Sequence, residues 1–365
     1  MEVTLEQLEL DPHPVLAQLR PLAWIPALNG WLVTGRDAAI EVMRDHETFT
    51  VDDPRFSTAR VVGPSMLSRD GAEHARHREP FARPLRLTSV RERFADIVES
   101  HVDRLIDAFE PRGHAELRTE LAGPLAASVV AALLGLEAAD TAEMLDWYGA
   151  IVASVTRVAE GREPSDAGAA AFGRLRAAVE PELEAAGDLT RDEVVSNAAV
   201  LMFGGIETTE GMILNFVWHL LENGALPSAN ALEESLRLEP AAAVVDRYAT
   251  RDVELAGSQI RAGDFVEVSL AGANRDPAFF PDPDRFDPER VNAKQHVTWA
   301  QGPHICIGLH LARLEALSAA ERLFARLPEL RTSEPTAPRG LVFRKPPRLE
   351  VAWSSRPDVK VRRAG

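Results

Sequence analysis

The chain has one cysteine, three lysines and no long hydrophobic run in its 365 residues. A single cysteine excludes an intramolecular disulfide and fits a reducing compartment. No segment approaches the roughly 18 to 20 consecutive apolar residues that a membrane span needs. The N-terminus also lacks the basic and apolar regions of a signal peptide. These absences predict a soluble, cytoplasmic protein with no membrane partner.

Linkers and excess positive charge are also missing. No low-complexity or Ser/Gly-rich segment divides the chain, so the sequence predicts a single domain over residues 1–365. The net charge of −16 argues against nucleic acid as a partner. Arginines are nevertheless concentrated at positions 69, 76, 78, 83, 86, 91 and 93. Such a stretch can bind an acidic partner, although it is as often a solvated helix face.

The hydrophobic pattern predicts a mainly α fold with a minor β-sheet region. Apolar residues recur at three- and four-residue spacing from about Asp70 to Leu221, which is typical of helices. Strand patterns are confined to the two ends of the chain, at 24–34, 253–270 and 349–353.

The only cysteine, Cys306, lies in the segment Trp299-Ala-Gln-Gly-Pro-His-Ile-Cys-Ile-Gly308, directly before a helical pattern. A thiolate is a strong metal ligand, and Gly302 and Gly308 allow a tight turn and the close approach of a flat ligand. The N–H groups that begin the next helix would favour the anionic sulfur. A lone cysteine is more often a small buried hydrophobe, but this flanking pattern favours a ligand.

A second motif, Gly204-Gly205-Ile-Glu207-Thr208-Thr209, interrupts an otherwise apolar helical segment that belongs in the core. Each glycine costs about 1 kcal/mol relative to alanine, and close packing against another helix would explain the pair as well as a functional role does. A carboxylate in such a helix is costly unless it is paired, hydrated or functional. Thr208 is expected to donate a hydrogen bond to the Gly204 carbonyl and to loosen the helix there.

Together these motifs resemble the cytochrome P450 family, whose haem-thiolate loop and oxygen-binding helix have this form. The resemblance extends from about Trp31 to Trp353 and identifies the chain as a soluble bacterial-type haem-thiolate monooxygenase. It implies a cytochrome P450-like fold and haem b, with Cys306 as the axial iron ligand. It also implies that Glu207 and Thr208 are catalytic and deliver protons during the activation of dioxygen.

The resemblance assigns roles to further residues. Glu234 and Arg237, in an E-x-x-R motif, and Arg285, in Pro-Asp-Arg-Phe, match a structural network of the family. The positions that match its haem-binding residues are His74, Arg78, Arg247, His304 and Gly308. The residues expected to line the substrate pocket are Met66, Leu67, Phe203, Gly204, Ala242, Ala243, Val244 and Phe343.

Three departures from the family pattern also stand in the sequence. Trp299 replaces the usual phenylalanine beside the cysteine loop, where a larger ring would change the surroundings of the sulfur. Pro80 is expected to end or kink the helix that carries His74 and Arg78. Only residues 222–230 separate the oxygen-side helix from the E-x-x-R helix, so the short helix that the family has there is predicted to be lost.

The predicted reaction is the oxidation of a small, apolar or amphipathic organic substrate by dioxygen, in bacterial secondary metabolism. With no second cysteine and no G-x-G-x-x-G loop, two electrons must come from a ferredoxin or flavodoxin with its reductase, docked near Arg76, Arg83 and Arg86. A peroxide-driven enzyme is one alternative, which the intact Glu207–Thr208 pair disfavours. A non-catalytic haem gas-binding protein is the other, and it would need no such pair.

Overall fold

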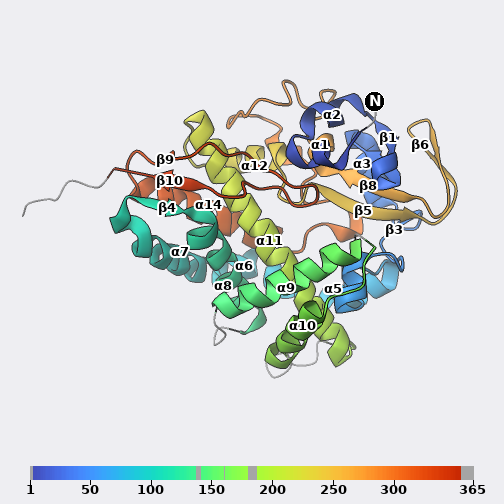
Figure 1. Ribbon diagram of the computed structural model, residues 1–365, viewed down its shortest axis with the longest axis horizontal. Helices are drawn as coiled ribbons and strands as arrows, with labels where there is room; N and C mark the ends of the chain where they lie inside the picture. Colours follow the sequence, from blue (N-terminus) through green and yellow to red (C-terminus); the bar gives the residue numbers. More distant parts are fainter. Residues whose placement is uncertain (1–2, 137–140, 160, 180–186, 355–365) are drawn as a thin grey trace, which may run out of the picture.

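The computed structural model describes residues 3–136, 141–159, 161–179 and 187–354. Most of these residues are helical, and the strands form small sheets at two places in the molecule (Figure 1). The first seven helices are α1 (Leu5–Leu10), α2 (His13–Gln18), α3 (Arg36–Arg44), α4 (Ser57–Val62), α5 (Gly71–Ala82), α6 (Leu87–Arg93) and α7 (Ala95–Phe109). The remaining helices are α8 (Gly123–Leu134), α9 (Thr141–Ala159), α10 (Asp166–Val179), α11 (Arg191–Asn223), α12 (Ala229–Leu238), α13 (Leu270–Ala273) and α14 (Leu309–Arg326).

Helix α11 is the central element, and its ends are set by local signals. Thr190 and Glu193 form a capping box at its start, which satisfies free N–H groups of the first turn. Gly224, in the left-handed conformation with φ of 59°, ends it. The helix crosses the middle of Figure 1 and packs on α8, α14 and α12. Because nearly every face is covered, the all-round apolar pattern of its sequence is explained.

The larger sheet holds five strands in the order β1-β2-β8-β5-β3. Its strands are β1 (Leu22–Ile25), β2 (Gly30–Val33), β3 (Phe49–Thr50), β5 (Val244–Ala249) and β8 (Phe265–Ser269). The predicted hairpin near the N-terminus is present, with Trp24 opposite Trp31 in antiparallel register. β2 and β8 pair in parallel, which joins the N-terminal hairpin to a segment more than 200 residues later. Strand β5 was not predicted from the sequence.

Two smaller sheets complete the fold. A three-stranded sheet has the order β4-β10-β9, and a two-stranded ribbon pairs β6 with β7. Their strands are β4 (His114–Glu116), β6 (Val253–Leu255), β7 (Ser258–Ile260), β9 (Arg331–Thr332) and β10 (Glu350–Ala352). In Figure 1 the three-stranded sheet lies on the left, across α11 from the larger sheet. In the described part of the chain, no helix is long and apolar enough to cross a membrane.

Two predicted departures can be compared with the structure. Residues 224–228 join α11 directly to α12, and no helix intervenes in this fully described stretch, which confirms the predicted loss. Pro80 lies inside α5, which continues only to Ala82 before a 3-10 turn begins at Arg83. The helix therefore ends just after the proline, and Arg78 stays on it.

Candidate active site

The Cys306 loop is held by its own backbone. The Cys306 N–H donates to the Trp299 carbonyl at 2.8 Å, and Gly302 turns the chain with φ of +76°, close to the backbone of Met43 and Arg44. Burial raises the pKa of the Cys306 thiol, while the Gly308 N–H, Arg78, Arg313 and the Leu309 N–H oppose this rise. The pKa of the thiol is raised overall, so these N–H groups and arginines reduce, without cancelling, the cost that burial places on the thiolate.

A pair of imidazoles in contact, tilted by 39° to each other, joins this loop to α5. The rings of His74, on α5, and His304 have centroids 4.2 Å apart. His304 Nε2 lies 2.7 Å from an Asp70 carboxylate oxygen, which fixes its orientation. Arg78 donates to the Ile305 carbonyl at 2.7 Å and so ties α5 to the cysteine loop. Asp70 was missed by the sequence reasoning, because an aspartate directly before a helix is usually read only as a cap.

These residues fit a flat group that carries two carboxylates. His74 Nε2 is buried without a hydrogen-bond partner among the described residues, and burial, followed by His304 and Arg78, lowers the His74 pKa to about 4. Arg247 is also buried, and its guanidinium donates to the Asp246 carbonyl at 2.7 Å. A methyl group added at Gly204 or Gly308 would meet nothing within 4 Å. Unused donors and open space beside the thiol are what haem requires.

The oxygen-side motif lies on α11. Thr208 donates to the Gly204 carbonyl, which confirms the expected bond. The Glu207 carboxylate accepts from Lys345 Nζ at 2.6 Å and from the Tyr148 hydroxyl. Glu207 is therefore a paired carboxylate. Neither partner was found from the sequence, since both are distant along the chain and in no motif with it.

The predicted substrate pocket is only partly assembled. Phe203 and Phe343 meet edge to face with centroids 5.4 Å apart, and Ala242 pairs with Phe343 through a β-bridge. Met66 is buried in the main core and Leu67 is half-buried beside it. Gly204 is exposed.

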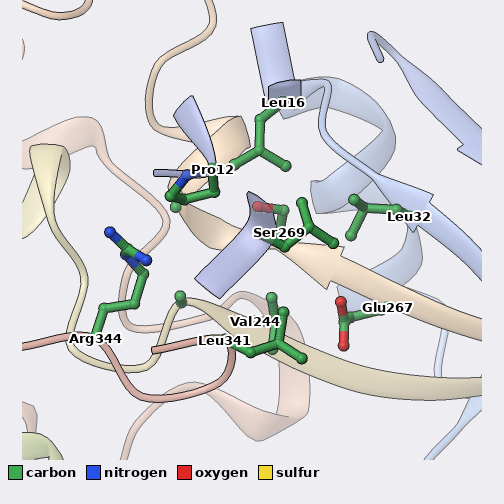
Figure 2. Close-up of a pocket in the computed structure, with 11 residues that line it drawn as sticks. Pro12, Leu16, Leu32, Val244, Glu267, Ser269, Leu341 and Arg344 are labelled. Carbon is green, nitrogen blue, oxygen red and sulfur yellow. The ribbon is translucent and has the colours of Figure 1, made fainter. Parts of the chain in front are cut away.

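Two of the predicted pocket residues face elsewhere. Ala243 and Val244 lie in the buried cluster formed with α1 and α2, because the chain enters β5 there. Both line a small cavity on that side, and Figure 2 shows Val244 among the labelled residues that line it. The proposed substrate pocket therefore excludes these two residues.

The E-x-x-R network is confirmed for two of its three predicted members. Arg237 donates to both Glu234 oxygens at 2.7 and 2.8 Å, and both side chains are fully buried. The third side chain is that of Arg290, whose Nε lies 2.9 Å from Glu234 Oε1. The assignment of Arg285 was wrong: its side chain is exposed, and only its carbonyl accepts bonds, from Arg237 and Arg290. The chain turns between these arginines, so only Arg290 reaches the core.

Of the three arginines predicted to bind the electron donor, one is paired within the protein and two are exposed. Arg76 is committed to ion pairs with Glu73 and Glu193, at 2.8 and 2.5 Å. Its charge therefore serves to join α5 to α11. Arg83 and Arg86 are exposed and lie just after α5.

Known proteins resemble the chain over most of its length. A family model for cytochrome P450 matches residues 228–347. The cytochrome P450 monooxygenase PikC of Streptomyces venezuelae is 35% identical across 88% of this chain and 85% of that protein. Nocardicin C N-oxygenase of Nocardia uniformis subsp. tsuyamanensis is 34% identical, across 94% of this chain and 96% of that protein.

The fold gives the same result. The crystal structure of CalO2 superposes with a TM-score of 0.85 at 28% identity, covering 94% of this chain and 96% of that chain. P450BioI, solved in complex with an acyl carrier protein bearing a fatty acid, gives a TM-score of 0.84 at 26% identity over 96% of this chain and 100% of that chain. With the thiol loop, the oxygen-side helix and this likeness in agreement, the chain belongs to the bacterial cytochrome P450 monooxygenases, a haem-dependent family.

Proposed function

We propose that the protein uses haem b, dioxygen and two electrons from a separate donor to oxidise a small organic substrate. When bound, haem with Cys306 as its iron ligand supplies the oxygen-activating chemistry. The observation that carries the proposal is the Thr208 hydroxyl bonded to the Gly204 carbonyl, with Glu207 beside it. This arrangement places an alcohol and a carboxylate next to an open position on α11.

The remaining residues hold the parts in place. His74 and Arg247 provide the unused buried donors for the haem carboxylates, with Arg78 and His304 beside them. Gly308 leaves room for the flat group next to the sulfur. Glu234, Arg237 and Arg290 fix the core below the cysteine loop. Glu207 and Thr208 pass protons inward as the catalytic pair.

The substrate is proposed to be apolar or amphipathic. The distal side chains offered to it are Met66, Leu67, Phe203, Ala242 and Phe343, with open space at Gly204. Several relatives are named for the oxidation of an organic substrate. One is mycinamicin IV hydroxylase/epoxidase of Micromonospora griseorubida, which is 33% identical to this chain. We therefore place the substrate among bacterial secondary metabolites, and the electron donor among ferredoxins and flavodoxins with their reductases.

The test is the visible spectrum of the purified protein, reduced under carbon monoxide. A Soret band at the long wavelength typical of thiolate-ligated haem is expected, and Cys306→Ala should remove it. A band typical of histidine ligation, or a protein that binds no haem, would overturn the proposal. Turnover supported equally well by hydrogen peroxide alone would favour the peroxide-driven alternative over an electron-fed monooxygenase.

A further inference from the structure

The Glu207 carboxylate has both of its oxygens occupied by side chains from other parts of the chain. Oε1 accepts from Lys345 Nζ at 2.6 Å, and Oε2 accepts from the Tyr148 hydroxyl. Tyr148 is buried, so its hydroxyl has little access to water as a substitute partner. We call Tyr148 and Lys345 the carboxylate clamp.

Negative and positive side chains alternate from Glu207 to the surface of the protein. Lys345 Nζ also lies 2.6 Å from Glu210 Oε1, which accepts from Arg118 Nε at 2.8 Å. The Lys345 side chain is 10% exposed, whereas that of Arg118 is 42% exposed. Two carboxylates one helical turn apart on α11 would repel each other without the ammonium between them. Lys345 therefore fixes the charge and the direction of both.

The clamp connects three parts of the chain, two of which, α9 and α11, make few other contacts with each other. Glu207 is on α11, Tyr148 is on α9, and Lys345 is in the segment that pairs with Arg339 near the C-terminus. Helix α9 packs chiefly on α10, α4 and α8, and contacts α11 less. The Tyr148 hydroxyl is thus a specific polar link from α9 to the catalytic acid. A shift of α9 would release one carboxylate oxygen.

We propose that Lys345 and Tyr148 are positioning residues for Glu207, and that Tyr148 makes the position of this acid depend on helix α9. The inference rests on the proposed function, since it assigns Glu207 to proton delivery. Lys345 holds one carboxylate oxygen and keeps the side chain ordered. Tyr148 holds the other oxygen until α9 moves.

The first test needs no bound haem. The chain has two tyrosines, so Tyr248→Phe leaves Tyr148 as the single tyrosine. Burial, with Glu207 and Glu210, raises the pKa of Tyr148 so far that its phenol stays protonated in the folded protein, and the hydrogen bond itself is the readout. In this background, labelled with 13C at the tyrosine Cζ, Glu207→Gln should move the Cζ resonance, because the phenol loses a charged acceptor. A Cζ resonance at the same position in the Glu207→Gln protein and its parent would overturn the contact.

The second test uses the holoenzyme with an oxidised substrate and its electron donor. Lys345→Met should lower kcat severalfold, raise the share of electrons lost as hydrogen peroxide and change the solvent isotope effect. The substrate Kd from the spin-state shift should stay within about twofold, and Lys345→Arg should restore coupling. The same replacement at exposed Lys294 is the matched control and should change none of these values.

A double variant distinguishes a positioning role from a general loss of structure. Because Tyr148→Phe and Lys345→Met disturb one carboxylate, the double variant should lose less than the product of the single effects. Multiplicative effects, or a lower kcat with unchanged coupling and isotope effect, would overturn the inference. These outcomes presuppose a normal thiolate Soret band in every variant. Its absence from the parent protein would count against the proposed function instead.

Discussion

At the scale of single residues, Glu234 is a fully buried carboxylate that accepts four hydrogen bonds. Its carboxylate receives both nitrogens of the Arg237 fork, Nε of Arg290 and the Asp287 N–H. A fully buried carboxylate is tolerable only when hydrogen bonds satisfy it in this way. The cost of removing a partner is therefore set by the charge left behind.

We predict that Arg290→Ala lowers the free energy of unfolding by about 1–3 kcal/mol, because Glu234 loses one buried donor while Arg237 still compensates its charge. Arg285→Ala is the matched control. It removes an exposed side chain and keeps the carbonyl that Arg237 uses, so the change should stay within about 0.5 kcal/mol. Urea unfolding of the two variants measures the difference. Equal losses would contradict the assignment of Arg290.

The sequence could predict one contact of this network but not which arginine is its third member. The E-x-x-R spacing places Glu234 and Arg237 on one helix face, which is enough to predict their contact. Arg285 and Arg290 both lie in an irregular segment, which has no repeating pattern of buried positions to indicate which side chain points inward. Asp70 and Lys345 are similar cases, because their contacts with His304 and Glu207 join segments that only the complete fold brings together.

At the scale of elements, the two adjacent glycines of α11 have different reasons to be small. A methyl group at Gly205 would lie 2.5 Å from Val130 Cγ2 on α8, which is a clash. A methyl group at Gly204 would meet nothing within 4 Å. The packing and the functional explanations of this pair are therefore both supported, each by a different residue.

This difference predicts opposite effects of one substitution. Gly204→Ala should raise the free energy of unfolding of the haem-free protein by about 1 kcal/mol, since alanine favours helix and meets no neighbour. Gly205→Ala should lower it by about 1–3 kcal/mol through overpacking against Val130. Denaturant unfolding of both apoproteins provides the comparison. A loss of stability for Gly204→Ala would show that its open space is not present in solution.

A second inter-element contact predicts a pH dependence. Glu233, on α12, accepts from His296 and from Arg313 of α14, so it joins α12 to the helix that follows the cysteine loop. Burial raises the pKa of Glu233, but the hydrogen bonds from His296 and Arg313 outweigh it and hold the pKa at about 2. The unfolded value is near 4.5.

A carboxylate with a depressed native pKa contributes stability above its unfolded pKa and loses it as pH falls through the native value. We therefore expect Glu233 to contribute about 3 kcal/mol near neutral pH and to lose it between about pH 5 and pH 2. Glu233→Gln should flatten the dependence of unfolding free energy on pH in this window. Exposed Glu254→Gln should leave the slope unchanged. Parallel wild-type and Glu233→Gln curves would contradict the contact.

At the scale of the whole molecule, the helices and several of the strands could be predicted, but the pairing of distant strands into one sheet could not. Helices α8 to α11 follow apolar periodicity, which is a local signal. The five-stranded sheet depends on pairing between segments more than 200 residues apart, such as β2 with β8. β5 carries Asp246 and Arg247 in a strand that only its neighbours stabilise. Confinement to one domain and a cytoplasmic location stay predictions.

The distribution of charge is the remaining feature of this scale. The chain carries a net charge of −16, yet Arg83, Arg86 and Arg91 are all exposed in the segment that follows α5. This segment lies near the cysteine loop, since Arg78 binds the Ile305 carbonyl and α6 contacts α14. If the electron donor is acidic, as proposed, these arginines would attract it, while the negative charge of the rest of the protein would repel it, and docking here would speed association.

We predict that Arg86→Glu lowers the rate of electron transfer from an acidic ferredoxin about tenfold at low ionic strength, through slower association. The difference from wild type should shrink as salt is raised, because screening shortens the reach of exposed charges to about 8 Å near physiological ionic strength. Arg261→Glu makes the same change of charge at an exposed site on the loop after β7 and is the matched control. Stopped-flow reduction under carbon monoxide across a salt series measures both. If the two variants slow equally, the effect belongs to the net charge of the molecule, and the surface after α5 is not the docking site.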